Sequence, residues 1–390
     1  MTQLRWMTAG ESHGPSLTVI IDGVVAGLPL RAEDINAQLA RRQKGYGRGG
    51  RMKIESDTVS IESGVRDGHT LGSPIALRIV NRDHENWIGR MGAAPFDAPP
   101  EPVTLPRPGH ADLAGVQKYD RRDARDILER ASARETAART AAGAVARVLL
   151  AQCGIEVCSR VRAIGSVRDE QDVSVDELFS SRTRLEESSL RVLSESAEAR
   201  MRDEILARSH AGDTAGGVIE VVARNVMVGL GSHVHWDRRL DGQIAQAMMS
   251  VQAIKAVSIG DGIAAASRPG SEVHDPIGHS GAPPEFTRSS NFAGGIEGGM
   301  SNGQPIVVFA FMKPIATLRR ALLSAHLDSK EPAPAAHERS DVCAVPAAGV
   351  VLEAMLCLTL ASALLEKFGG DSLRELSRNV ASYLQQLRDY

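Results

Sequence analysis

The sequence has few aromatic residues and no excess of positive charge. Phe, Trp and Tyr make up 4% of the 390 residues, so a core must be built mainly from Ala, Val, Leu and Ile. The net charge is −3, whereas broad nucleic-acid binding needs a positive excess that displaces counterions. We therefore expect a folded globular protein that has no nucleic-acid partner.

The four cysteines and the N-terminus exclude further classes. Cys153, Cys158, Cys343 and Cys357 form no C-x-x-C pair and show no zinc spacing. The opening stretch MTQLRWMTAG is too polar for a signal peptide, and no apolar run reaches the ~18 residues that a membrane span needs. These absences predict reduced structural cysteines, no bound metal, no membrane association and a cytoplasmic location.

Lysine is also scarce, with seven among 45 basic residues, so 38 are arginine. The planar guanidinium binds carboxylate and phosphate through paired N–H groups, which lysine lacks. The sequence contains no Walker A pattern and no G-x-S-x-G, which disfavours P-loop phosphoryl transfer and hydrolase chemistry of that type. We therefore looked for places where arginines gather near other reactive side chains.

The stretch KGYGRGGRM contains a complete G-x-G-x-x-G in Gly45, Gly47 and Gly50. This motif binds a dinucleotide when it follows a strand and opens a helix. Here residues 31–44 predict a helix before the glycines, and residues 51–64 predict a strand or hairpin after them. The order is therefore inverted relative to a dinucleotide-binding fold.

Three interpretations of this glycine stretch remain. It is a flexible turn, or a loop in which Arg48 and Arg51 reach an anionic ligand, or the phosphate turn of an NAD(P)-dependent oxidoreductase. We favour the anion-binding loop, because other stretches of the chain carry the same chemistry. The oxidoreductase is the alternative function.

Two histidines lie in glycine-containing loops. GESHG places His13 just before a predicted strand, and RPGHAD places His110 beside Arg107 and Asp112. A histidine titrates near neutral pH and can protonate a departing anion. A surface turn is the simpler explanation for either motif, but their occurrence together favours an acid–base role.

Residues 121–152 give the strongest helix signal. Arg130 and Arg134 are four apart, as are Ser132 and Thr136, so each pair should share a helix face. Alanine fills the rest of the segment, which predicts a buried helix whose arginines need anionic partners. A solvated face with Glu129 and Glu135 as ion-pair partners is the alternative.

Further candidate segments follow along the chain. KPIAT, residues 313–317, comes directly after a predicted strand, and its lysine and threonine can hold a phosphate. In RSDVC, Arg339 and Asp341 are two apart and point to one side of an extended stretch. Residues 165–205 are acidic and predict a variable peripheral insertion with a helix from about Ser196. Residues 241–257 predict a helix, IVVFAFM before KPIAT predicts a strand, and the last 40 residues are expected to be helical. With no internal repeat or linker, we expect one α+β domain over residues 1–390.

Eight motifs occur in the order found in one known family. They are GESHG, GYGRGGRM, RPGHAD, ERASARETAAR, GDTAGGVIE, GGIEGGMSNGQPI, KPIAT and RSDVC. Together they resemble the chorismate synthase family over almost the whole chain, apart from the acidic stretch. The resemblance implies a β-α-β sandwich, with central helices between antiparallel sheets, that assembles as a homotetramer.

The resemblance also implies an activity. Members are lyases that bind reduced FMN and convert 5-enolpyruvylshikimate 3-phosphate to chorismate and phosphate by a trans-1,4 elimination without net redox change. This is the last common step of the shikimate pathway to aromatic amino acids. NADPH is a possible reductant of the flavin. The substrate carries two carboxylates and a phosphate, which suits the abundance of arginine.

Residue by residue, the resemblance implies the following site. His13 assists the departure of phosphate, His110 protonates the reduced flavin, and Asp341 helps the flavin to remove the ring proton. The flavin-contacting positions are Arg130, Ala131, Ser132, Gln252, Ala253, Gly298, Lys313, Pro314, Ile315, Ala316, Thr317 and Arg339. The positions expected to bind NADPH or the anionic groups of the substrate are Arg42, Arg48, Arg51, Arg107 and Arg134.

Overall fold

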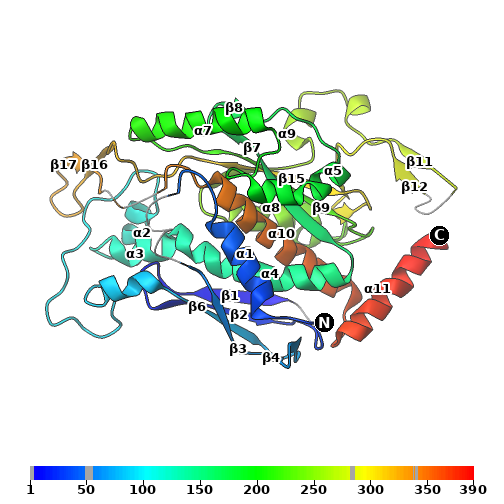
Figure 1. Ribbon diagram of the computed structural model, residues 1–390, viewed down its shortest axis with the longest axis horizontal. Coiled ribbons are helices and arrows are strands. Elements are labelled where there is room, and N and C mark those ends of the chain that lie inside the picture. The colour runs from blue at the N-terminus through cyan, green and yellow to red at the C-terminus, as the bar shows by residue number, and fades with distance from the viewer. Residues whose placement is uncertain (1–3, 49–55, 282–285, 337, 339–340) are drawn as a thin grey trace.

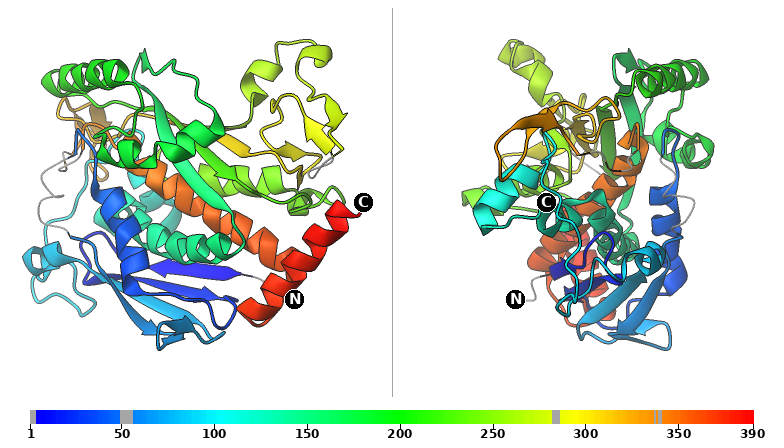
Figure 2. Two further views of the ribbon diagram at one scale, coloured as in Figure 1. Left: turned by 45° about the vertical axis from the view of Figure 1, so that its right-hand side comes forward. Right: turned by 90° about the vertical axis from the view of Figure 1, so that its left-hand side faces the viewer.

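A computed structural model describes residues 4–48, 56–281, 286–336, 338 and 341–390 of the chain. Two antiparallel sheets enclose a layer of helices (Figure 1). Figure 2 shows the same order of layers from two further directions. The predicted α+β sandwich with central helices is therefore confirmed.

The first sheet has the strand order β1-β2-β6-β3, formed by Arg5–Ala9, Ser16–Asp22, Ile75–Val80 and Val59–Ser63. In β2 the residues Leu17, Val19 and Ile21 alternate with more exposed ones and are almost completely buried. This period of two gives the sheet one apolar face, which lies against the helices.

The second sheet has the order β10-β15-β9-β7-β8. Its strands are Ile254–Ile259, Ile306–Met312, Gly217–Arg224, Glu156–Ile164 and Val167–Arg168. The predicted strand IVVFAFM is thus confirmed as β15. The predicted helix over 241–257 was too long: α8 (Leu240–Met249) ends at Met249, and a turn in which Ala253 has a left-handed backbone with φ +68° leads into β10 at Ile254.

The central layer contains α1 (Ala32–Gln43), α4 (Thr136–Gln152), α8 and α10 (Val345–Phe368). The predicted burial of the alanine-rich segment is confirmed in α4, which packs closely on α10. A Cβ added at Gly143 would lie 2.3 Å from Cβ of Ala354, so the missing side chain permits this approach.

Helix α10 corrects the prediction about membrane spans. It is long and apolar enough to cross a membrane by length and composition, because only Glu353 interrupts its first twenty residues. In the folded chain 89% of its most apolar window is buried, between the two sheets (Figure 2). A helix that is apolar all round is either a membrane span or a core helix, and its surroundings here are those of a core helix.

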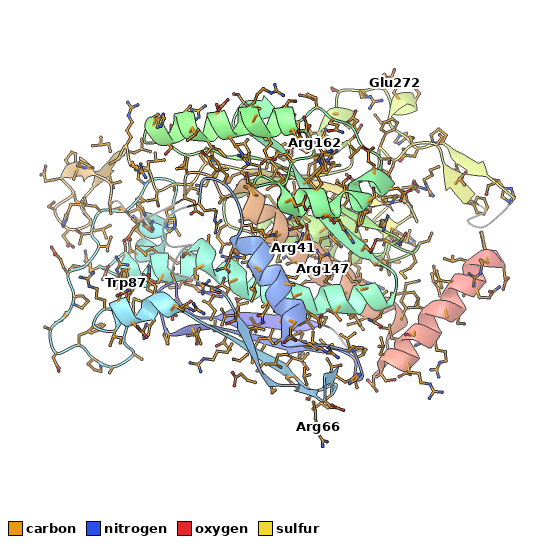
Figure 3. All side chains as sticks on the ribbon, viewed as in Figure 1. Arg41, Arg66, Trp87, Arg147, Arg162 and Glu272 are labelled. Carbon is orange, nitrogen blue, oxygen red and sulfur yellow. The ribbon has the colours of Figure 1, made fainter. Side chains whose placement is uncertain are left out.

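Glu353 lies in the middle of α10 and is completely buried. Its carboxylate accepts hydrogen bonds from Arg41 at 2.8 and 3.0 Å, from Arg191 at 3.0 Å, from Ser159 at 2.7 Å and from Arg147. Figure 3 labels Arg41 and Arg147 at the centre of the molecule. Burial alone would raise the pKa of Glu353, but the three guanidiniums outweigh it and hold the pKa far below its usual range.

The predicted helix over 121–152 is interrupted. It consists of α3 (Arg125–Ala131), the 3-10 turn η3 (Ala133–Glu135) and α4. Ser132 has extended backbone angles, φ −60° and ψ 143°, and its side chain accepts a hydrogen bond from the Arg134 N–H, because a serine hydroxyl can cap the turn that follows. The prediction that Arg130 and Arg134 share a face is therefore wrong.

The acidic segment contains three helices that cover the outer side of the second sheet. They are α5 (Val175–Ser180), α6 (Arg182–Glu187) and α7 (Glu195–His210), with α7 at the top of Figure 1. The predicted helix start near Ser196 is confirmed by α7. Its Ile205 also belongs to the main core, so this segment is not only peripheral.

The remaining elements are short, apart from the C-terminal helix α11, which the sequence predicted. They are β4 (Val65–Arg66), β5 (His69–Thr70), η2 (Arg82–Trp87), α2 (Asp112–Tyr119), η4 (Trp236–Arg238), α9 (Gly262–Ala265), η5 (Gly270–Glu272), β11 (Ile277–His279), β12 (Phe286–Arg288), β13 (Ile296–Glu297), β14 (Met300–Ser301), β16 (Leu323–Ala325), β17 (Pro332–Pro334) and α11 (Leu373–Arg388).

Candidate active site

His13 is held by a buried carboxylate. Its ring Nδ1 lies 2.9 and 3.0 Å from the two carboxylate oxygens of Glu129, which also accepts the His13 backbone N–H at 2.8 Å. Arg125 donates to the same carboxylate at 2.9 Å. The ring of Trp87 stacks on the imidazole with a centroid distance of 4.0 Å. Trp87 is labelled in Figure 3, at the end of the molecule that holds α2 and α3.

His110 has a similar arrangement. Its Nδ1 is hydrogen-bonded to the fully buried carboxylate of Asp112. Arg107 donates to both oxygens of that carboxylate, at 2.8 and 3.1 Å, and to Thr317 Oγ1 at 3.0 Å. Burial alone would raise the pKa of Asp112, but the hydrogen bonds from His110 and Arg107 hold it well below its usual range. Each predicted catalytic histidine therefore carries a carboxylate–arginine pair on Nδ1.

Three predicted anion-binding arginines gather at a third place. Arg42 and Arg134 pair with Asp57 at 3.3 and 2.5 Å, and Arg48 pairs with Asp341 at 3.1 Å. Burial lowers the pKa of Arg42 to about 9, with the charges of Arg48 and Arg134 acting in the same direction against the attraction of Asp57. Arg42 remains protonated at neutral pH, and within these pairs guanidiniums outnumber carboxylates. Such an excess attracts an anion.

Glu135 connects two of the predicted flavin positions. It accepts hydrogen bonds from Gln252 Nε2 at 3.1 Å and from Thr8 Oγ1 at 2.8 Å, and Arg130 Nη2 lies 3.8 Å from it. Gln252 Oε1 is buried and accepts no hydrogen bond within the part of the chain that the structure describes. A buried acceptor of this kind is unusual in a folded protein and points to a donor from a ligand or water.

The KPIAT segment lies between the Gln252 region and the His110 loop. The Lys313 N–H donates to the carbonyl of Ala253 at 2.9 Å, while Lys313 Nζ donates to the carbonyl of Gly109 at 2.6 Å. At the other end of the segment, Thr317 receives the hydrogen bond from Arg107. The segment therefore connects the Gln252 region to the His110 loop, and places Pro314, Ile315 and Ala316 between them.

Two further bridges join the remaining groups. Asn81 accepts from Arg134 Nε at 2.9 Å and donates to the carbonyl of Gly14 at 2.8 Å, which connects the arginines to the His13 turn. Thr214 Oγ1 donates to the carbonyl of Ile315 at 2.8 Å, and the next residue, Ala215, donates its N–H to Val342 at 2.9 Å. The GDTAGG motif thereby connects KPIAT to the segment that carries Asp341.

Gly298 lies elsewhere. It occupies the turn between β13 and β14, where the carbonyl of Gly299 accepts the N–H of Leu240, the first residue of α8. Gln252 follows the other end of that helix, whose ten residues span about 15 Å. Within one chain Gly298 is therefore not beside the other predicted flavin residues. Arg51 and Arg339 lie outside the described residues.

Some residues of this site were not predicted. Asp57 is 77 positions away from Arg134 along the chain, and Trp87 is 74 away from His13. Nothing in the local pattern around either residue indicates its partner. Glu129 was considered only as an ion-pair partner on a helix face. The expectation of buried arginines implied that buried carboxylates would pair with them. It did not indicate which residues those carboxylates would be.

The cysteines, all within the described residues, form no disulfide. Burial raises the pKa of Cys343 and of Cys357 to about 11, so both thiols stay protonated and unreactive at neutral pH. Within the described part of the chain, no group of three or more His, Cys, Asp or Glu side chains is placed to hold a metal ion.

Comparison with known proteins identifies the family of the chain. The sequence model of one family, chorismate synthase, matches residues 4–365. The chain belongs to the chorismate synthase family. Relatives named chorismate synthase include one from Solibacter usitatus, 54% identical over 99% of this chain and 100% of its own length, and one from Geobacter sulfurreducens, 55% identical over the same shares. A crystal structure of chorismate synthase covers 100% of this chain and 99% of its own, with a TM-score of 0.81 and 45% identity.

Family membership confirms the resemblance that the eight motifs predicted, and with it the class of a carbon–oxygen lyase acting on phosphates. The alternative of an NAD(P)-dependent oxidoreductase is not supported. In the chorismate synthase fold found here, Gly45 and Gly47 follow the C-terminal end of α1 instead of opening a helix, so they cannot present a helix N-terminus to a pyrophosphate.

Proposed function

We propose that the chain catalyses the chorismate synthase reaction, the trans-1,4 elimination of phosphate from 5-enolpyruvylshikimate 3-phosphate to give chorismate. The full-length match to relatives of that name carries this proposal. The arrangement of the site supports it, because two imidazoles and several guanidiniums from distant segments are joined by short hydrogen bonds. A substrate with two carboxylates and a phosphate needs such a set of cations.

Arg42, Arg48, Arg107 and Arg134 are proposed to bind the anionic groups of the substrate, or of NADPH where it serves as reductant. Arg51, in the same glycine stretch as Arg48, is proposed to join them. Three of these guanidiniums are buried, where charge-assisted hydrogen bonds to a ligand are less screened by water than at a surface. Each holds a carboxylate partner that keeps it oriented before the substrate binds.

His13 is proposed to donate a proton to the departing phosphate from Nε2, since Nδ1 is bonded to Glu129. His110 is proposed to supply a proton to the reduced cofactor, again from Nε2, since Asp112 holds Nδ1. Asp341 is proposed to accept a proton at a carboxylate oxygen as the substrate ring loses one. Its pairing with Arg48 keeps it next to the anion-binding groups.

The residues near Gln252 fit reduced FMN. The buried Gln252 Oε1, which accepts no hydrogen bond from the described residues, offers an acceptor to a ring N–H, and the Arg130 and Lys313 side chains offer cations to anionic groups. The neighbouring residues of these segments are proposed to complete the site, together with Arg339: Ala131, Ser132, Ala253, Pro314, Ile315, Ala316 and Thr317. When bound, the reduced flavin supplies an electron-rich ring that stabilises positive charge developing on the substrate as phosphate leaves.

Gly298 is proposed to reach the flavin from a neighbouring subunit, because within one chain it lies beyond the opposite end of α8 from Gln252. This agrees with the proposed homotetramer. We further propose a cytoplasmic enzyme that acts on small molecules only, with neither a nucleic acid nor a membrane as partner.

The reaction is tested by measuring phosphate release from 5-enolpyruvylshikimate 3-phosphate under anaerobic conditions, with and without reduced FMN. We expect release that depends on the reduced flavin, with no nicotinamide consumed per turnover. Equal rates without flavin would reject the proposal. Stoichiometric oxidation of NADPH during turnover would favour the oxidoreductase instead.

A further inference from the structure

We infer that Glu129, clamped by Arg125, is a positioning residue that fixes the tautomer and orientation of His13. This inference rests on the proposed role of His13 as the acid for the departing phosphate. Its burial leaves almost no surface of Glu129 for contact with a ligand. It acts through the imidazole, from a position that is 2% exposed.

The charge on Glu129 determines which nitrogen of His13 carries hydrogen. Burial alone would raise the pKa of Glu129, but hydrogen bonds from the His13 ring and backbone and from Arg125 outweigh it and lower the pKa. The carboxylate is therefore ionised at neutral pH and can only accept hydrogen bonds. His13 Nδ1, 2.9 and 3.0 Å from its oxygens, must then be the donor, so Nε2 is the nitrogen left to exchange a proton.

Glu129 is itself held in place. Arg125 donates to it at 2.9 Å and donates to Glu338 at the same distance. The Ser12 N–H donates to the backbone carbonyl of Glu129 at 3.0 Å. The carboxylate therefore has little freedom to turn away, and the His13 turn is tied to α3 through backbone as well as side chain.

The segment η2 holds the imidazole from another direction. The Trp87 ring stacks on the imidazole at 4.0 Å, with the Arg125 guanidinium 4.9 Å from the Trp87 centroid. His84 Nδ1 donates to the His13 carbonyl at 2.9 Å, and Asp83 Oδ2 lies 3.9 Å from His13 Nε2. Stacking fixes the plane of the imidazole but does not determine which nitrogen is protonated. Glu129 determines it.

A carboxylate on Nδ1 contributes to acid catalysis in two ways. It keeps the ring in one tautomer, and it stabilises positive charge on the ring. Replacing it with an isosteric amide removes the charge and offers an N–H to Nδ1 as well as a carbonyl. The amide therefore permits the wrong tautomer without changing the shape of the site.

The test compares Glu129→Gln and Glu129→Asp with the wild-type protein. We expect Glu129→Gln to lower kcat by roughly 100-fold, the scale of losing general acid catalysis, while KM and flavin affinity change by less than about threefold. Glu129→Asp, which keeps the charge, should recover part of the lost rate. Glu220→Gln is the control, because it removes a carboxylate paired with Arg160 on the second sheet, and it should leave kcat unchanged.

A second measurement does not depend on activity. Nitrogen-15 NMR of the histidine rings, assigned with His13→Gln, reports which nitrogen carries hydrogen in the protein without substrate. We expect the Nδ1–H form in the wild-type protein and a mixture of tautomers in Glu129→Gln. Should Glu129→Gln fail to fold, Glu129→Asp with its shorter side chain provides the comparison.

The outcomes separate this inference from the proposed function. An unchanged kcat in Glu129→Gln, or the same single tautomer as in the wild-type protein, overturns the role of Glu129. An equal loss of rate in the Gln and Asp variants also overturns it, because a purely structural role does not distinguish them by charge. If the wild-type protein releases no phosphate, the proposed function fails, and the NMR measurement still decides whether Glu129 sets the tautomer.

Discussion

Individual buried carboxylates control the cationic side chains of this site. Glu129 and Asp112 each bind one imidazole and one guanidinium, and Asp57 binds two guanidiniums. A buried carboxylate without such partners would be neutralised. The pairs therefore exist before any ligand arrives, and a substrate meets groups that are already oriented.

His110→Ala tests the second imidazole. We expect turnover to fall roughly 100-fold because general acid catalysis is lost, while FMN still binds. Phosphate release and a flavin absorbance titration measure the two quantities. His235→Ala, which removes an exposed imidazole paired with Asp237, is the control. Wild-type turnover in His110→Ala would contradict the assignment.

Arg48→Ala tests anion binding. The variant removes a guanidinium beside Asp341, so we expect KM for the enolpyruvyl substrate to rise roughly tenfold to a hundredfold, the scale of a charge-assisted hydrogen bond, with a smaller change in kcat. Steady-state kinetics separate the two. The exposed Arg378→Ala should match the wild-type protein, and a fall in kcat at constant KM in Arg48→Ala would indicate a different role.

The sequence predicted the chemical types at the site better than their partners. His13, His110, Arg42, Arg48, Arg107 and Arg134 were all named, and the structure links each to a buried or half-buried carboxylate. Asp112 lies in the same motif as His110 and Arg107, but the other carboxylates come from other segments, such as Asp57 for Arg134. A single sequence contains no signal for such a long-range pair.

At the scale of elements, the crossing of α4 and α10 depends on one missing side chain. Alanine forms helices better than glycine by about 1 kcal/mol, which would favour Gly143→Ala. However, the added Cβ would also lie 2.5 Å from the backbone Cα of Ala354, and overpacking of this kind costs ~1–3 kcal/mol. We expect net destabilisation, measured by urea unfolding. Gly89→Ala is the control, since nothing lies within 4 Å of its added Cβ.

The acidic segment holds the glycine turn in place. The carboxylate of Glu186 accepts from Arg41 at 2.8 Å, and its carbonyl accepts from Lys44 at 3.3 Å. The Tyr46 N–H donates to the carbonyl of Ser189 at 2.9 Å. These contacts immediately precede Arg48, so the segment determines where that guanidinium lies.

Glu186→Gln tests this dependence. Weakening the contact to Arg41 should loosen the turn, and we expect KM for the substrate to rise about fivefold, corresponding to ~1 kcal/mol for one hydrogen bond, without loss of flavin binding. Glu177→Gln, in the exposed part of α5, is the matched control. If both variants keep the wild-type KM, the segment does not position the turn.

Periodicity predicted most of the long elements, including α1, β15, α7 and the C-terminal helices. It failed where side-chain capping or backbone conformation overrides it. Ser132 interrupts the helix predicted over 121–152 by capping η3, and a turn with a left-handed Ala253 separates α8 from β10. Both failures lie at positions proposed to contact the flavin. Functional sites are where local secondary-structure preference is most often overridden.

For the molecule as a whole, Glu353 connects the layers. It joins α10 to α1, to α4, to β7 and, through Arg191, to the acidic segment. Removing one partner of a buried ion pair costs about 3–5 kcal/mol, because the remaining charges lose their compensation. The network therefore couples the stability of all layers.

Glu353→Gln should lower stability most at neutral pH. The pKa of Glu353 is depressed in the folded state, so its contribution is fully present above the ordinary value of 4.5 and declines as pH falls below it. The variant should therefore lose stability relative to wild type at pH 7, and the difference should shrink in acid. Urea unfolding at several pH values measures this. A difference that stays constant or grows in acid would contradict it.

The predicted helices and strands, without an internal repeat or linker, indicated only one α+β domain. The order of layers was predicted from the resemblance of eight motifs to a family, because the sequence of a single strand does not indicate which sheet it joins. β2 and β6 are adjacent in the first sheet although more than fifty residues separate them. Such long-range pairing is decided by the packing of the whole core.

The stacking of Trp87 on His13 also provides an optical signal. The chain contains three tryptophans, and the other two, Trp6 and Trp236, contact neither histidine of the site in the described contacts. Replacing those two with phenylalanine would leave one indole whose fluorescence depends on the state of the adjacent imidazole. Ligand arrival and proton transfer at His13 should then be visible in stopped-flow emission, with no added dye and no flavin absorbance.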